Sequence, residues 1–230
     1  MNRILSAALV SITVTFASPA WAEMPQTDVA LVEQLSAKSP EDVLKALEVY
    51  YTLHVSEIDV QLTTEQNTGA FFAARRAEAD GDKAEVERQM AAFEGTKAAL
   101  AAAKKVNQGL RQKLAAMTAI SFGDDLHMAP EAPDTLPAAP AGAPTALLAA
   151  RTDAWQRVES ARKTWGEMRL KLLEDQEQYD KTRTVKIGDS MRAMTKAEVA
   201  LARAACDFRL LEARIAIATG KPLVSVLGGL

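Results

Sequence analysis

The sequence has little of the chemistry that most enzymes need, because its 230 residues include one cysteine and two histidines. The lone cysteine, Cys206, excludes an intrachain disulfide. Its neighbours Ala204, Ala205 and Phe208 indicate a small buried side chain in a helix rather than a reactive thiol. His54 lies beside the apolar stripe of a predicted helix, where we expect a packed or half-exposed side chain without a catalytic role.

Glycine-rich phosphate loops, nucleophile motifs and paired-cysteine motifs are also missing from the sequence. Asp124, Asp125, His127 and Met128 are metal-ligand residue types in one cluster, but their spacing fits no known coordination geometry and favours a solvated turn. The net charge of −3 at pH 7 argues against nucleic acid and anionic lipid as partners. We therefore expect no enzyme activity, no cofactor and no metal.

The one long apolar run, residues 4–16, is too short to span a bilayer, which needs roughly 20 apolar residues. Arg3 precedes this run, and Ala20-Trp21-Ala22 follows it as a small-x-small cleavage site. These features predict a cleavable signal peptide over residues 1–22, with an uncleaved anchor as the alternative. We expect export to the periplasm, with association to the outer membrane left open.

Aromatic residues make up only 5% of the chain, a balance typical of long helices packed closely along their length. Residues 23–38 lack periodicity, and we expect a flexible arm there. Ser39 as N-cap and Pro40 in the first turn then begin a helix. Its apolar residues recur every three or four positions. They are Leu44, Leu47, Tyr51, Val55, Ile58 and Leu62.

Gly81 is predicted to end this first helix in the left-handed conformation, and Asp82 to cap the next one. The second helix, about residues 83–119, carries apolar residues at intervals of seven, with Asn107 as the polar member of the seam. A polar residue on such a seam fixes the register of the pairing. We therefore expect a first helical hairpin over residues 39–129.

A proline-rich linker over residues 130–146 leads to a second hairpin over residues 147–222 and a tail over residues 223–230. Gly220 and Pro222 end the last helix. The seven-residue repeats are Val158, Trp165, Leu172 and Tyr179 in one helix, and Met194, Leu201, Phe208 and Ile215 in the other. We predict an all-α fold, an elongated antiparallel four-helix coiled-coil bundle made by approximate internal duplication.

Residues 136–220 also carry short motifs in a fixed order. Before the third helix come Leu136-Pro137, Gly142, Pro144-Thr145, Leu147-Leu148 and Arg151-Thr152-Asp153; later come Ile187-Gly188-Asp189-Ser190, Asp207-Phe208, Ala213, Ile215 and Ala218-Thr219-Gly220. In this order they resemble the repeat junction and last long helix of the TolC-like outer-membrane efflux proteins, with Thr152 replacing a proline. The match over residues 40–123 is weaker.

The resemblance implies a periplasmic component of an envelope export or efflux system that docks an adaptor protein through its hairpin tips. It also implies a homo-oligomer, by family resemblance a trimer. The alternating strands of the family's membrane barrel are not visible in this sequence. The alternative is a stand-alone periplasmic structural or chaperone-like coiled-coil protein without a transport role. The residues matched to docking tips are Gly81, Asp82, Ile187, Gly188, Asp189 and Ser190.

Overall fold

The computed structural model describes residues 27–120, 132–182 and 187–229. Within these ranges all regular secondary structure is helical, which confirms the predicted all-α class. The helices are α1 (Asp28–Gln34), α2 (Pro40–Asp80), α3 (Lys83–Thr118), α4 (Thr145–Thr182), α5 (Ile187–Ala218) and α6 (Leu223–Leu227). The predicted proline-rich linker matches the helix-free residues 132–144 in front of α4.

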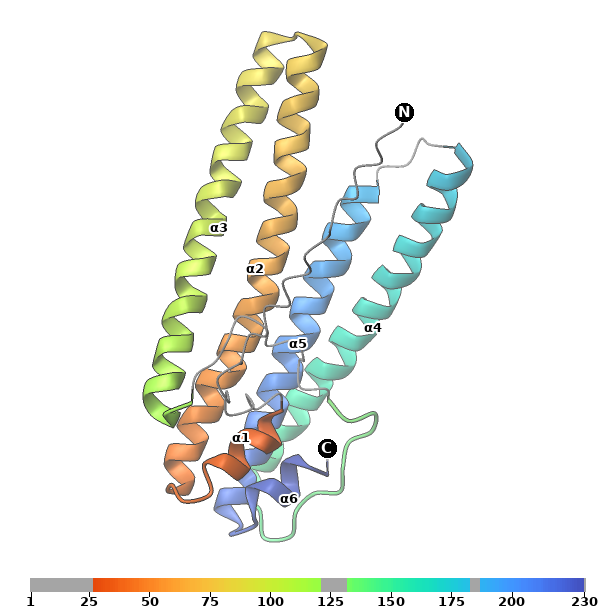
Figure 1. The fold of residues 1–230 in the computed structure, drawn as a ribbon. Helices are drawn as coiled ribbons and strands as arrows, with labels where there is room; N and C mark the ends of the chain where they lie inside the picture. Colours follow the sequence, from red (N-terminus) through yellow and green to blue (C-terminus); the bar gives the residue numbers. More distant parts are fainter. Residues whose placement is uncertain (1–26, 121–131, 183–186, 230) are drawn as a thin grey trace, which may run out of the picture.

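The long helices form a row in the order α3, α2, α5 and α4 (Figure 1). Helix α2 packs against α3 and α5, and α4 packs against α5. Among the described residues α3 makes no contact with α4, so the row is open at its two outer helices. The finer prediction, a coiled-coil four-helix bundle, therefore stays a prediction.

The two hairpins point the same way (Figure 1). The Gly81 turn and the adjoining ends of α4 and α5 lie at one end of the molecule, which we call the tip end. The other end, which we call the base, holds α1, α6 and the residues before α4. The α2–α3 hairpin reaches farther toward the tip end than the α4–α5 hairpin.

Local capping signals set the predicted limits of α2 and α3. The Ser39 hydroxyl accepts a hydrogen bond from the Asp42 amide at 3.2 Å, and Pro40 is the first residue of α2. Gly81 ends α2 with a φ of +74°, a left-handed conformation that a side chain would strain. The Asp82 carboxylate accepts from the amides of Ala84 and Glu85 at 3.0 and 3.3 Å. These predictions are confirmed.

The packed core lies toward the base. Helices α2 and α5 are the inner members of the row, so each buries side chains against two neighbours. Near α1 and α6 the core contains Leu31, Leu35, Leu47, Tyr50, Leu53, Leu114 and Leu227. Between α4 and α5 it contains Trp155, Val158, Phe208, Leu211 and Ile215. The predicted burial of Cys206 is confirmed.

The prediction of a flexible arm over residues 23–38 is wrong for the part of it that the structure describes. Residues 28–34 form α1, capped by the Thr27 hydroxyl, which accepts from the Ala30 amide at 3.1 Å. Leu31, Val32 and Leu35 are buried against α2 and α6. A helix of two turns is too short to show a periodic pattern, and contacts distant in sequence hold it in place. The predicted tail likewise contains α6, whose Leu227 is buried.

Candidate functional site: the hairpin tips and the base

The first predicted tip is a solvated, capped turn. Gly81 and Asp82 are both exposed. An ion pair of 2.8 Å joins Arg75 and Glu78 on α2 just before the turn, and the side chains of Gln89 and Glu85 are hydrogen-bonded at 2.7 Å just after it. The turn therefore presents polar groups on a backbone that its caps hold in one conformation.

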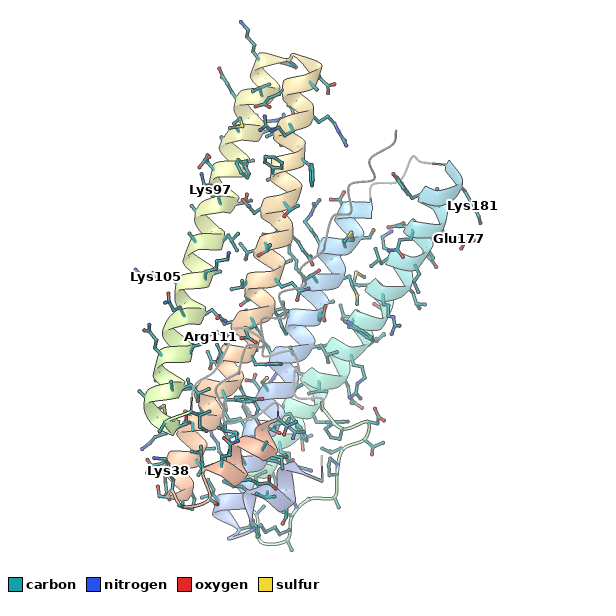
Figure 2. The ribbon with its side chains drawn as sticks, viewed as in Figure 1. Lys38, Lys97, Lys105, Arg111, Glu177 and Lys181 are labelled. Atoms are coloured by element: carbon teal, nitrogen blue, oxygen red, sulfur yellow. The ribbon has the colours of Figure 1, made fainter. Side chains whose placement is uncertain are left out.

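The second predicted tip differs from the expected turn, because α5 already begins at Ile187. Gly188 and Asp189 are exposed in the first turn of this helix. Asp189 forms an ion pair with Arg192 of the same helix. On α4, Glu177 and Lys181 lie near this end and pair at 2.6 Å (Figure 2).

Ser190 is the exception among the tip residues, since its side chain is buried. Its hydroxyl donates a hydrogen bond to the Asp175 carboxylate of α4, which also pairs with Lys171 at 3.2 Å. The Ser190 hydrogen bond and then Lys171 lower the pKa of Asp175 below its ordinary value. Ser190 thus joins α4 to α5 and is shielded from a partner.

Apolar side chains are exposed on both arms toward the tip end. Phe71 contacts Phe72 and Phe93 with ring centroids 5.6 Å apart, and the Arg75 guanidinium lies over the Phe71 ring. Phe72 itself is 62% exposed. On the other hairpin Leu170, Leu173 and Met191 are exposed. Both arms therefore offer apolar contact surface.

Polar side chains join α3 to α2 along the first hairpin. The Asn107 amide contacts the Ser56 hydroxyl at 3.5 Å and accepts from Arg111 at 2.9 Å. Arg111, labelled in Figure 2, also forms an ion pair with Glu57 of α2. Lys97 and Lys105, by contrast, point away from α2 into solvent (Figure 2). The Asn107 contacts are consistent with the expected role in setting register, which stays a prediction.

A groove of about 760 Å³ runs beside α2, between α3 and α5. Val55 of α2, Val106 and Leu110 of α3 and Leu210 of α5 supply its apolar lining. On the α5 side its rim is formed by Arg203 and Arg214, which pair with Asp59 and Glu48 of α2 at 2.7 Å. Because these rim arginines already have partners, they offer no unpaired positive charge with which to select a ligand.

A heavily buried polar cluster lies at the base and centres on Asp28. The Arg209 guanidinium donates to both carboxylate oxygens of Asp28, and the Tyr51 hydroxyl donates to the same group at 2.6 Å. Arg209 also donates to the Leu227 carbonyl at 2.9 Å. One ion pair therefore connects α1, α2, α5 and α6. Burial, and then the charge of Asp28, raises the pKa of Tyr51 well above its ordinary value.

A second buried ion pair joins α4 to α5, between Arg151 and Glu212. Arg151 also donates to the Pro137 carbonyl at 2.9 Å, which fixes the segment before α4 to the bundle. The Arg151 guanidinium lies 5.8 Å from the centroid of the Phe208 ring. Both buried pairs depend on α5, where Arg209 and Glu212 are one turn apart.

Sequence reasoning missed both ion pairs and the full environment of His54. Arg209 and Glu212 are charged residues within an apolar run around Phe208 and Leu211. Their position in that run was the available signal that both side chains are buried. His54 is packed, as expected, but both of its ring nitrogens lack a hydrogen-bond partner in the described structure. The predicted tips lie at one end, but α3 contacts neither α4 nor α5 in the described ranges.

The described residues contain no cluster of three or more His, Cys, Asp or Glu side chains that could hold a metal ion. The cluster at residues 124–128 lies outside these residues. None of the described helices is both long and apolar enough to cross a membrane.

No protein-family model, curated protein or solved structure matches the chain, so the TolC-like resemblance rests on the quoted motifs alone.

Proposed function

We propose that this protein is an exported, TolC-related helical component of an envelope export or efflux system, which docks a partner protein through its hairpin tips. The observation that supports this proposal is the parallel arrangement of the two hairpins. Their tips lie at the same end, so one partner can contact both (Figure 1). The core lies toward the opposite end, so tip contacts leave it undisturbed.

The accessible tip residues are those that can report docking. Asp189 has a 70% exposed side chain, and Asp82 is also exposed, whereas Ser190 is buried. We therefore choose Asp82→Cys and Asp189→Cys, each in a Cys206→Ala background so that the new thiol is the only one. Lys163→Cys, at a 79% exposed side chain midway along α4, is the matched control.

In cells, a thiol-reactive crosslinker should capture the same envelope protein from both tip positions and not from position 163. Capture from all three positions alike, or from neither tip, contradicts docking through the tips.

Export is tested separately. The mature protein is expected to begin at Glu23 and to fractionate with the periplasm, and a chain that retains residues 1–22 contradicts the cleavable signal peptide.

The second candidate is a stand-alone structural or chaperone-like protein that binds clients along its arms. The exposed apolar residues of both arms favour it, among them Phe72 and Leu170. It predicts that Phe72→Asp and Leu170→Asp abolish suppression of client aggregation, whereas the tip variants retain it. The export role is favoured instead if crosslinking depends on the tips and the arm variants suppress client aggregation no differently from the wild type.

Self-association belongs to the same proposal. Within the described residues, α3 packs against no helix but α2, and α4 against none but α5. We expect α3 and α4 to contact further copies, with a trimer as the state that the family resemblance implies. A monomeric mass by light scattering at micromolar concentration contradicts this.

A further inference from the structure

His54 is an unusual residue to find in the core of the base. Its side chain is 2% exposed, and neither ring nitrogen has a hydrogen-bond partner in the described structure. The neighbouring Tyr50 hydroxyl is buried without a partner as well, and the two rings stack with centroids 6.4 Å apart. A neutral imidazole tolerates this setting far better than a cation does, because a buried charge without a partner carries a large desolvation cost.

The charged and titratable groups around His54 come from several elements. Helix α1 supplies Asp28, α3 supplies Arg111, and α5 supplies Arg209 and Cys206. On α2 itself, Tyr50, Tyr51 and Glu57 lie within about one turn of His54. Helix α6 has no ionisable side chain. Asp28 favours the charged imidazole, but it is already paired with Arg209. Burial dominates and lowers the pKa of His54 to about 4.

We propose that His54 is an acid-sensitive latch, and that protonation of its imidazole releases α1 from the base. Water must reach the ring to stabilise an imidazolium, and α1 is a short helix whose Asp28 carries the charge that acts on His54. Helix α1 has seven residues and is held by Leu31, Val32, Leu35 and the Asp28 network. His54 is one turn beyond Tyr50 and Tyr51 on α2, next to the contact between Tyr51 and Asp28.

The difference in the pKa of His54 between the closed and released states sets how strongly pH shifts the release of α1. The released state holds His54 near its ordinary pKa of 6.5, and the closed state holds the pKa at about 4. Between these values the released state binds the extra proton, so the equilibrium constant for release rises by up to about tenfold per pH unit as the pH falls. Above pH 6.5 the imidazole is neutral in both states, and the latch stays closed.

The native thiol of Cys206 provides a readout, because it is buried in the same core cluster as Leu31 and Leu35. The full-length mature chain is treated with 4,4′-dithiodipyridine, which reacts with thiols in mildly acidic solution, at pH values from 7.5 to 4.5. Hydrogen exchange of the α1 amides is followed in parallel. We expect α1 exchange and Cys206 labelling to rise together below pH 6.5 by ten- to hundredfold, while the α4–α5 core stays protected.

His54→Leu keeps an apolar side chain of similar size and removes the proton site, so it should abolish the acid-induced rise. His127→Leu changes the other histidine and should leave the rise intact. A rise that persists in His54→Leu, or one that is lost in His127→Leu, overturns the proposal.

A wild-type measurement covers the case in which His54→Leu does not fold. The NMR titration of the His54 ring should follow the same midpoint as α1 exchange. Titration of that ring near pH 6.5 with α1 still protected overturns the latch.

Discussion

The guanidinium of Arg209 donates hydrogen bonds to both carboxylate oxygens of Asp28, although 181 positions separate the two residues in the sequence. Two parallel charge-assisted hydrogen bonds of this kind fix orientation as well as distance. The pair is almost fully buried and is completed by the Tyr51 hydroxyl and the Leu227 carbonyl. It therefore locks the first and last helices of the described chain onto α2 and α5.

Asp28→Asn should strongly destabilise the protein, because it leaves the buried Arg209 cation without its counter-ion. Breaking a buried pair in this way typically costs about 3–5 kcal/mol. Asp59→Asn is the matched control, since Asp59 also pairs with an arginine of α5, but at the surface. There we expect a loss of about 0–1 kcal/mol. Urea unfolding followed by circular dichroism measures both, and equal losses contradict the assignment.

Phe208→Ala should remove a large part of the packing between α4 and α5. The Phe208 side chain is 0% exposed and its ring centroid lies 5.3 Å from that of Trp155. Truncating a buried phenylalanine typically costs about 3–5 kcal/mol, and the fluorescence of Trp155 should change as well. Phe72→Ala makes the same truncation at an exposed site, where we expect a change within about 0.5 kcal/mol.

Gly81→Ala and Gly69→Ala should change stability in opposite directions. An added Cβ meets nothing within 4 Å at either position, so the difference lies in the backbone. Gly81 has a φ of +74°, where an L-residue is strained by about 1–2 kcal/mol. Gly69 lies within α2, where alanine is favoured by about 0.5–1 kcal/mol. Thermal unfolding of both variants tests the assigned left-handed cap.

Cys206 should be unreactive in the folded protein well into the alkaline range. Burial, followed by the charges of Asp207 and Asp28, raises the pKa of its thiol from 9.0 to about 12. The protonated thiol is neutral in both states below pH 9, so its contribution to stability is complete there. Above pH 9 the unfolded chain loses the proton first, and stability falls up to about pH 12.

Iodoacetamide labelling measures this directly. Native protein at pH 9 should label far more slowly than urea-unfolded protein at the same pH, because the thiolate is the reacting form. The Cys206→Ala variant should lose less stability than the wild type between pH 9 and 10, below the range in which Tyr51, whose pKa is also raised by burial, adds its own alkaline loss. Equal labelling rates for folded and unfolded protein contradict the assigned burial.

Features set by neighbours along the chain were predictable from sequence. The caps at Ser39 and Asp82 and the turn at Gly81 follow from local hydrogen bonding and backbone conformation, and α3 ends within one residue of its predicted limit. Burial of Phe208 and Ile215 follows from the seven-residue repeat. Whether the tips dock a partner is a question of surface recognition, and it stays a prediction.

Features set by distant contacts were not predictable. The sequence predicts one apolar stripe on α2, but Tyr50 and Leu53 are also buried, because α2 lies between α3 and α5. Asp28 holds α1 through a residue at the other end of the sequence, so a segment without periodicity became ordered. The sequence places Ser190 at a docking tip, yet its side chain is buried and donates a hydrogen bond to Asp175 across the hairpin.

The concentration of packed side chains near the base implies a gradient of local opening along the length of the molecule. Amide protons around Gly81 can exchange through brief separation of the last turns of a two-helix arm, whereas those around Phe208 must wait for the whole domain to come apart. Local opening should therefore be easiest at the tip end of the molecule and hardest at its base.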